Sequence, residues 1–176
     1  GGLVLNRVTL DGNTAVLHGG GLGNKSSSGN NSTVANSTIT GNIVSTSSSE
    51  GGGIWNDSSS TLVTRNTTVA DNIALLGSGA NLYNKGELVA LNSIFANTLG
   101  SSNCAGPSKL TNSDGDGNVQ WPGTSCDALP NPIASGDPKL GASIPAGGPA
   151  GSKVFPIGAG SAATSYGNAT VCSDPP

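Results

Sequence analysis

The sequence is poor in charge, in aromatic side chains and in methionine. Its 176 residues include 7 Lys and Arg, 10 Asp and Glu, two each of Trp, Tyr and Phe, and no Met. So few basic residues cannot follow a phosphate backbone, which argues against nucleic acid as a partner. No apolar run reaches the roughly 18 residues of a membrane helix, so we expect no membrane insertion. The chain begins at Gly1 without Met or a charged leader, so we expect a signal peptide to be absent or already removed.

Cysteine is also scarce. Cys104, Cys126 and Cys172 are too few for a disulfide framework, and none forms a CxxC metal pair. Low charge and many Ser, Thr and Asn residues suit an extracellular protein, in which Cys104 and Cys126 could bridge a loop of roughly 20 residues. Free thiols are the alternative. Cys172 would then be left over, or would pair outside this chain.

Short apolar segments separated by glycine are abundant. The chain has 28 Gly, and hydrophobic residues make up 34% of it. They occur in β-branched or Leu-rich runs such as "GGLVL", "STITGNIV" and "ELVALNSIF", which are typical of strands. Because no segment keeps a helical period, we expect an all-β protein.

Two patterns alternate along the chain. The first reads "RVTLDGN", "NSTITGN", "NTTVADN" and "NSIFAN", and the second reads "GGGLGN", "GGGIWN" and "GANLYN". Together they define a repeat of about 25–32 residues with at least two short strands. A unit this short buries its apolar face only by stacking on its neighbours, which predicts a parallel β-solenoid.

Stacking places equivalent residues above one another. We expect two inward apolar rows, one of Leu10, Ile39, Val69 and Phe95 and one of Leu22, Ile54 and Leu82. Asparagine at the turns predicts two ladders of side-chain amides. The first consists of Asn13, Asn42, Asn72 and Asn97, and the second of Asn24, Asn56 and Asn84.

The repeat fades in the second half of the chain. We assign residues 1–126 to solenoid coils with a Cys104–Cys126 loop, and residues 127–176 to an irregular cap of the same domain. This last segment holds most of the prolines, which are excluded from central strands. It should cover the last coil or lie along the side of the coils, because a bare end coil is an open sheet edge.

The ordered series of motifs resembles a known family. "GGGIWN", "NSTITGN" and "NSIFAN", followed by "NCAG", "GNVQWPGTSC" and "GDPKLG", resemble secreted bacterial β-helix proteins with a choice-of-anchor Q domain. They are also similar to the repeats of polymorphic outer membrane proteins. The resemblance covers about residues 1–172. It implies a right-handed parallel β-helix, secretion and surface attachment, and it implies no catalytic mechanism.

Two motifs suggest chemistry at first. "HGGG" (His18–Gly21) can form the oxyanion loop of an esterase, but the chain lacks GxSxG and has no second histidine. Repeat alignment places His18 with Glu50 and Ser78, which indicates a turn of the scaffold. "DGDGN" (Asp114–Asn118) resembles half of a calcium loop, but Ser125 stands where the closing Glu belongs. We therefore predict no catalytic residue, no metal and no cofactor.

Trp55 and Tyr83 occupy equivalent positions in successive repeats, where the preceding repeat has Gly23. They alternate with Ile54 and Leu82, so they should point outward as an exposed platform for a sugar ring or a partner chain. The alternative is that neighbouring loops cover them.

These features predict a non-catalytic extracellular or cell-surface solenoid that is structural or adhesive and able to stack head-to-tail into a filament. Its expected partners are copies of itself, other surface proteins and glycans. The alternative is a carbohydrate-binding or polysaccharide-cleaving module. Asp11 and Asp71 are the nearest candidates for a carboxylate pair, at a separation of roughly 10 Å if they lie two coils apart.

Overall fold

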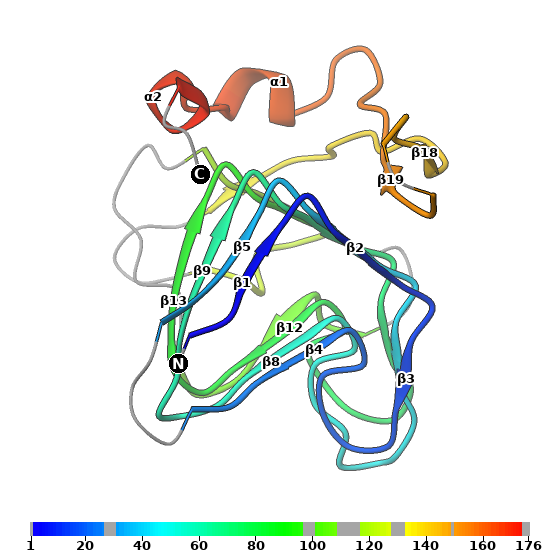
Figure 1. Ribbon diagram of the computed structural model, residues 1–176, viewed down its shortest axis with the longest axis vertical. Helices are drawn as coiled ribbons and strands as arrows, with labels where there is room; N and C mark the ends of the chain where they lie inside the picture. Colours follow the sequence, from blue (N-terminus) through cyan, green and yellow to red (C-terminus); the bar gives the residue numbers. More distant parts are fainter. Residues whose placement is uncertain are drawn as a thin grey trace.

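The computed structural model describes residues 2–26, 31–96, 101–108, 117–127, 133–148 and 150–173. The chain forms a parallel β-solenoid of about four turns, whose coils lie one behind another in a closed outline (Figure 1). The predicted fold class is confirmed. The helices of the described part are short, and none is long and apolar enough to cross a membrane.

Each of the first three coils contributes one strand to each of four parallel sheets. The first sheet contains β1 (Val4–Asn6), β5 (Asn31–Ala35), β9 (Thr61–Arg65) and β13 (Glu87–Leu91). The second contains β2 (Thr9–Asp11), β6 (Thr38–Thr40), β10 (Thr68–Ala70), β14 (Ile94–Ala96), β16 (Val119–Trp121) and β17 (Ala134–Ser135). The third contains β3 (Thr14–Ala15), β7 (Ile43–Val44) and β11 (Ile73–Ala74), and the fourth β4 (Leu22–Asn24), β8 (Ile54–Asn56), β12 (Leu82–Asn84) and β15 (Cys104–Ala105).

The core consists of apolar rows parallel to the axis. Strand register aligns Leu10, Ile39, Val69 and Phe95 in one row, and Leu22, Ile54 and Leu82 in another. Both predicted rows are confirmed. The register extends both rows, because Gln120 aligns with Phe95, Ser135 aligns with Gln120, and Cys104 aligns with Leu82. Burial of each large apolar side chain stabilises the fold by about 1.5–3 kcal/mol.

The C-terminal tail lies along the side of the coils. After β17 it includes the hairpin of β18 (Ile144–Pro145) and β19 (Lys153–Val154) and the helices α1 (Ala163–Tyr166) and α2 (Ala169–Ser173). Figure 1 shows these elements outside the closed outline of the coils. Leu140, Phe155 and Ala163 of the tail pack on Ala70, Ile94 and Ala96 of the second sheet. Beyond the predicted boundary at residue 126, β17 still pairs with β16, so the second sheet includes Ala134 and Ser135.

Hydrogen bonds fix the tail to early and late coils. The Lys153 backbone N–H donates to Thr9 Oγ1 at 2.9 Å, and the Lys153 ammonium pairs with Asp11 in the first coil. Near the other end, the Asn168 N–H donates to Asn92 Oδ1 at 2.7 Å. The tail therefore spans the second sheet along the solenoid axis.

Candidate functional site

The outer face of the fourth sheet carries the predicted aromatic pair. Strand register aligns Gly23, Trp55, Tyr83 and Ala105 in one row. The two rings thus occupy equivalent positions in successive coils, as predicted. This row alternates with the inward row that contains Ile54.

Glu50 is the centre of a polar cluster around these rings. Its Oε2 atom accepts hydrogen bonds from Trp55 Nε1 at 2.9 Å and from Lys85 Nζ at 2.8 Å. The Tyr83 hydroxyl bonds the same carboxylate, and His18 Nδ1 lies 3.4 Å from Oε2. The carboxylate thereby connects three successive coils, from His18 in the first to Lys85 in the third.

His18 and Lys85 both lie against the Trp55 ring. The His18 ring stacks on the indole with centroids 4.7 Å apart and planes at 10°. The Lys85 ammonium lies 5.7 Å from the Trp55 ring centroid and 5.4 Å from that of Tyr83, within cation–π range. Trp55 is only 8% exposed, while Tyr83 is half-buried. The expectation of two exposed rings is wrong for Trp55, because His18 and Lys85, which both lie beside Glu50, also cover the indole.

The contacts of the cluster shift the pKa values of Glu50, Lys85 and Tyr83. Burial raises the pKa of the Glu50 carboxyl, but hydrogen bonds from Lys85, Trp55 and Tyr83 outweigh it, so the pKa lies below its ordinary value. The hydrogen bond to Glu50 raises the pKa of Lys85. Burial, together with the charge of Glu50, raises the pKa of Tyr83. Glu50 is thus an ionised acceptor that fastens coils together, and it is poorly suited to proton transfer near neutral pH.

The "HGGG" segment belongs to this scaffold. Bridges join His18 to Glu50 and Glu50 to Ser78, which confirms the predicted alignment. A Cβ on Gly20 would lie 2.4 Å from the Gly52 carbonyl oxygen and 2.8 Å from that of Ile43. The glycines therefore allow close approach of neighbouring coils.

The two predicted asparagine ladders are present. Asn13 Nδ2 donates to Asn42 Oδ1, and Asn42 Nδ2 donates to Asn72 Oδ1, both at 2.9 Å. In the second ladder, Asn24 Nδ2 donates to Asn56 Oδ1 at 2.7 Å, and Asn56 Nδ2 donates to Asn84 Oδ1 at 2.8 Å. These amides bond along the axis and also bond buried backbone carbonyls.

The first ladder continues through residues that the sequence analysis did not assign to it. Asn72 Nδ2 donates to Asn81 Oδ1, and Asn81 Nδ2 donates to Asn103 Oδ1, both at 2.8 Å. Asn81 and Asn103 thus extend the row past Asn72. Asn97, the predicted fourth member, lies outside the described residues.

A third, more exposed ladder was missed. Asn36 Nδ2 donates to Asn6 Oδ1 at 3.0 Å, and Asn66 Nδ2 donates to Asn36 Oδ1 at 3.2 Å. Asn36, Asn66 and Asn92 have φ of 51°, 48° and 47°, a left-handed conformation that asparagine tolerates. The sequence feature that could have predicted this ladder is the asparagine at the start of "NSTITGN", "NTTVADN" and "NSIFAN".

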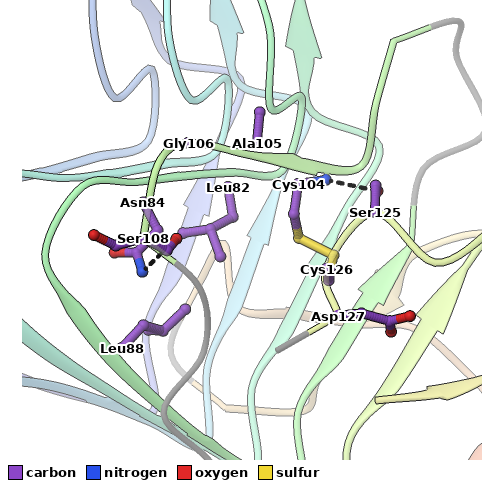
Figure 2. A pocket seen from close by; sticks show the side chains of 10 residues that line it. All are labelled: Leu82, Asn84, Leu88, Cys104, Ala105, Gly106, Ser108, Ser125, Cys126 and Asp127. Atoms are coloured by element: carbon purple, nitrogen blue, oxygen red, sulfur yellow. Dashed lines mark hydrogen bonds between the residues drawn. A yellow bond between two sulfur atoms is a disulfide. The ribbon is translucent and has the colours of Figure 1, made fainter. Parts of the chain in front are cut away.

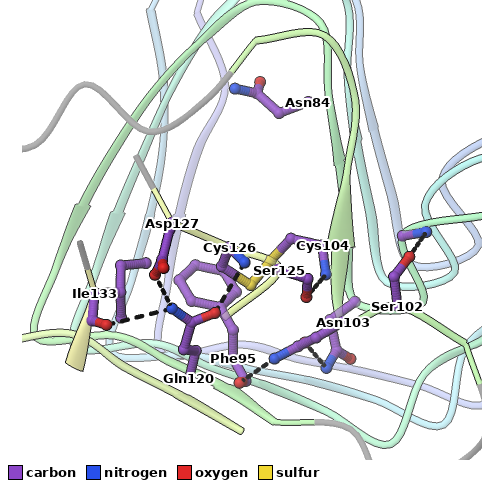
Figure 3. The surroundings of a disulfide bond; sticks show 12 residues. Asn84, Phe95, Ser102, Asn103, Cys104, Gln120, Ser125, Cys126, Asp127 and Ile133 are labelled. Atoms are coloured by element: carbon purple, nitrogen blue, oxygen red, sulfur yellow. Dashed lines mark hydrogen bonds between the residues drawn. A yellow bond between two sulfur atoms is a disulfide. The ribbon is translucent and has the colours of Figure 1, made fainter. Parts of the chain in front are cut away.

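Cys104 and Cys126 form the predicted disulfide, and Cys172 is free and exposed (Figure 3). Beside the disulfide, Gln120 Oε1 accepts the Cys126 N–H at 2.8 Å, while Gln120 Nε2 donates to Asp127 and to the Ile133 carbonyl. Gln120 is fully buried. Its amide forms hydrogen bonds with the Cys126 and Ile133 backbone groups next to the apolar row.

A small cavity adjoins the disulfide (Figure 2). Its volume is about 50 Å³, and its lining includes Leu82, Leu88 and the two bonded cysteines. Asn84 Nδ2 donates to the Ser108 carbonyl at its margin, at 3.2 Å. A cavity of this size suits small solvent molecules rather than an organic substrate.

A larger groove lies between the second sheet and the tail. Its volume is about 550 Å³. Ala96 and Trp121 contribute to it from neighbouring strands, Asp71 from the turn after β10, and residues 137–140 from the tail. Trp121 is 39% exposed. Sequence reasoning missed this groove, because only the return path of the tail creates it.

The half calcium loop has no metal-binding counterpart in the described part of the chain. Asp114 and Asp116 lie outside the described residues. Asn118 Oδ1 accepts the Ser93 N–H at 2.8 Å and Asn118 Nδ2 donates to the Ala90 carbonyl at 2.7 Å, so its amide serves the solenoid. Among the residues that the structure describes, no group of three or more His, Cys, Asp and Glu side chains could hold a metal ion.

Comparison with known proteins gave no match: no protein-family model, no curated protein and no solved structure matches this chain.

Proposed function

We propose that this chain is a non-catalytic structural or adhesive β-solenoid that works outside the cell, at a cell surface. The observation that carries the proposal is the axial continuity of the side-chain ladders, in which Asn13, Asn42 and Asn72 are joined amide to amide. Each coil is held by its neighbours, which suits a stiff rod that repeats its outer side chains every 4.8 Å or so. The Cys104–Cys126 disulfide supports an oxidising, extracellular compartment.

Self-association is part of this proposal. Parallel strand pairing joins successive coils, as between β1 and β5. Pairing of the same kind between copies is head-to-tail and continues into a fibre. Val4 and Val16 of the first coil are exposed apolar side chains, at 72% and 65%, and their proposed partner is a second copy of this chain.

Sedimentation velocity and negative-stain electron microscopy over a wide concentration range test the self-association. We expect concentration-dependent linear assemblies. The double change Val4→Lys and Val16→Lys should abolish them, because charged side chains block edge pairing. Leu76→Lys is the matched control, since Leu76 is also exposed but lies in the third coil. Monomers at every concentration would refute stacking.

Carbohydrate binding is the second candidate, and the groove beside the exposed Trp121 favours it. Cleavage is separated from binding by incubating the chain with neutral and acidic polysaccharides and measuring new reducing ends or unsaturated products. Turnover of any of them would contradict the non-catalytic proposal.

A further inference from the structure

The groove beside Trp121 has walls held by the fold. Trp121 lies in register with Ala96, and its carbonyl accepts a hydrogen bond from Asn103 Nδ2 at 3.2 Å. The wall on the tail side is residues 137–140. Binding surfaces that are ordered beforehand lose little conformational entropy when a ligand arrives.

Backbone hydrogen bonds fix the tail wall from behind. The carbonyl oxygens of Asp137, Pro138 and Lys139 accept hydrogen bonds from Ala162 N, Ser161 Oγ and Gly158 N at 3.0, 2.6 and 2.9 Å. Leu140 pairs with Ile157 in an antiparallel bridge and packs against the second sheet. The wall is thus part of the ordered structure.

Two residues that line the groove have a left-handed backbone conformation. Six described residues other than glycine have positive φ, and four of them, Arg7, Asn36, Asn66 and Asn92, occupy one equivalent corner of successive coils. The other two are Asp71 (φ 57°) and Lys139 (φ 45°), and both line the groove. The turn position of Asp71 is glycine in the first two coils, Gly12 and Gly41, at φ 68° and 63°. Residues held in such conformations cluster at ligand-binding sites.

We propose that this groove binds a neutral pyranose oligosaccharide, an inference that rests on the adhesive part of the proposed function. The exposed indole of Trp121 offers a flat apolar surface for the C–H face of a sugar ring. Asp71 and Asp137 offer carboxylate acceptors, and Lys139 offers an ammonium donor, to the ring hydroxyls.

The size and charge of the groove limit the class of sugar that it can bind. A volume of about 550 Å³ is within the range of small-molecule sites and suits two or three sugar rings. Two carboxylates against one ammonium leave the lining net negative, which disfavours uronic acids. Neutral sugars are therefore the expected class.

Titration of the full chain with cellotetraose, mannotetraose and chitotetraose tests the proposal, with calorimetry for affinity and NMR of the two indole N–H signals for location. We expect at least one of these sugars to bind and to shift the Trp121 signal, and galacturonic acid trimers to bind at least tenfold more weakly. Trp121→Ala should weaken binding at least tenfold, and Asp137→Asn several-fold. Tyr166→Ala should leave the affinity unchanged, since this exposed ring lies on α1 and does not line the groove.

Circular dichroism melting checks that each variant folds. If Trp121→Ala does not fold, the affinity of Asp137→Asn and the indole shift of the unmodified chain test the site in its place. The proposal is overturned if none of the three sugars binds, or if binding leaves the Trp121 signal in place. Self-association is measured separately, so its failure is distinguishable from a failure of sugar binding.

Discussion

Asn81 Oδ1 accepts a hydrogen bond of 2.8 Å from Asn72 Nδ2, and by this bond the first asparagine ladder passes from the turn after β10 to the segment before β12. Asn81 directly precedes β12, the position that Gly21 and Gly53 hold before β4 and β8 in the two preceding coils. Its amide therefore reaches the same corner of the core as the Asn72 amide. The ladder is one buried network that connects successive coils.

Asn42→Ala should strongly destabilise the protein. The Asn42 amide bonds the Asn13 N–H, the Leu10 carbonyl and Asn72 Oδ1, each at 2.9 Å, in a fully buried site. Its removal leaves several buried polar groups unpaired, so we expect a loss of about 3–5 kcal/mol in the free energy of unfolding.

Urea denaturation measures this loss. Asn36→Gly is the matched control, because it removes an amide from the more exposed ladder while glycine keeps the positive φ. We expect it to cost at most about 1 kcal/mol. Equal losses in both variants would show that burial does not set the strength of these ladders.

Gly53→Ala should destabilise the protein, whereas Gly23→Ala should not. A Cβ at Gly53 would lie 2.7 Å from the Asn81 carbonyl oxygen and 2.8 Å from Asn72 Nδ2, so the coils must separate, at a cost of about 2–3 kcal/mol. At Gly23 a Cβ meets nothing within 4 Å. Thermal melting of the two variants tests the pair, and a similar melting temperature for both would contradict the close packing at Gly53.

The regular part of the solenoid could be predicted because its information is local and repeated. Each strand has an apolar residue at the same place relative to Gly and Asn, so stacking aligns Ile39 with Val69 and Ile54 with Leu82 without knowledge of the path between them. The sequence did not predict that Asn81 belongs to the first asparagine ladder. Two different edges of the coil meet in one corner there, and sequence spacing does not show which amides face each other.

The site features depend on contacts between segments that the repeat does not relate. Trp55 is buried by His18 from the preceding coil and by Lys85 from the following one. Both of these side chains lie beside the Glu50 carboxylate. The Trp121 groove needs the tail to return along the second sheet, and the composition of the tail left two paths open. Both features follow from tertiary packing of single, non-repeated side chains.

The disulfide should stabilise the protein by about 3 kcal/mol. Cys104 and Cys126 are separated by 22 residues, and closing a loop of this length restricts the unfolded chain by about that amount. Replacing both cysteines with serine should lower the urea midpoint accordingly. Cys172→Ser is the control and should leave the midpoint unchanged, since its thiol is exposed. An unchanged midpoint in the double variant would show that the surrounding core alone holds this loop.

The Glu50 cluster should make stability depend on pH at both extremes. The pKa of Glu50 is lowered by folding, so its contribution is present above its ordinary pKa of 4.5 and is lost as pH falls through the lower folded value. The pKa values of Lys85 and Tyr83 are raised, so their contributions are complete below about pH 10 and are lost as pH rises through the folded values. Urea midpoints measured from acid to alkaline pH should therefore show a plateau with a fall on each side.

Glu50→Gln should lower the plateau by about 1–2 kcal/mol and reduce both falls, because Lys85 and Tyr83 lose their charged partner. Glu87→Gln, at an exposed carboxylate of β13, should keep the shape of the curve. If Glu50→Gln has the pH profile of the unchanged protein, the cluster does not fasten the three coils.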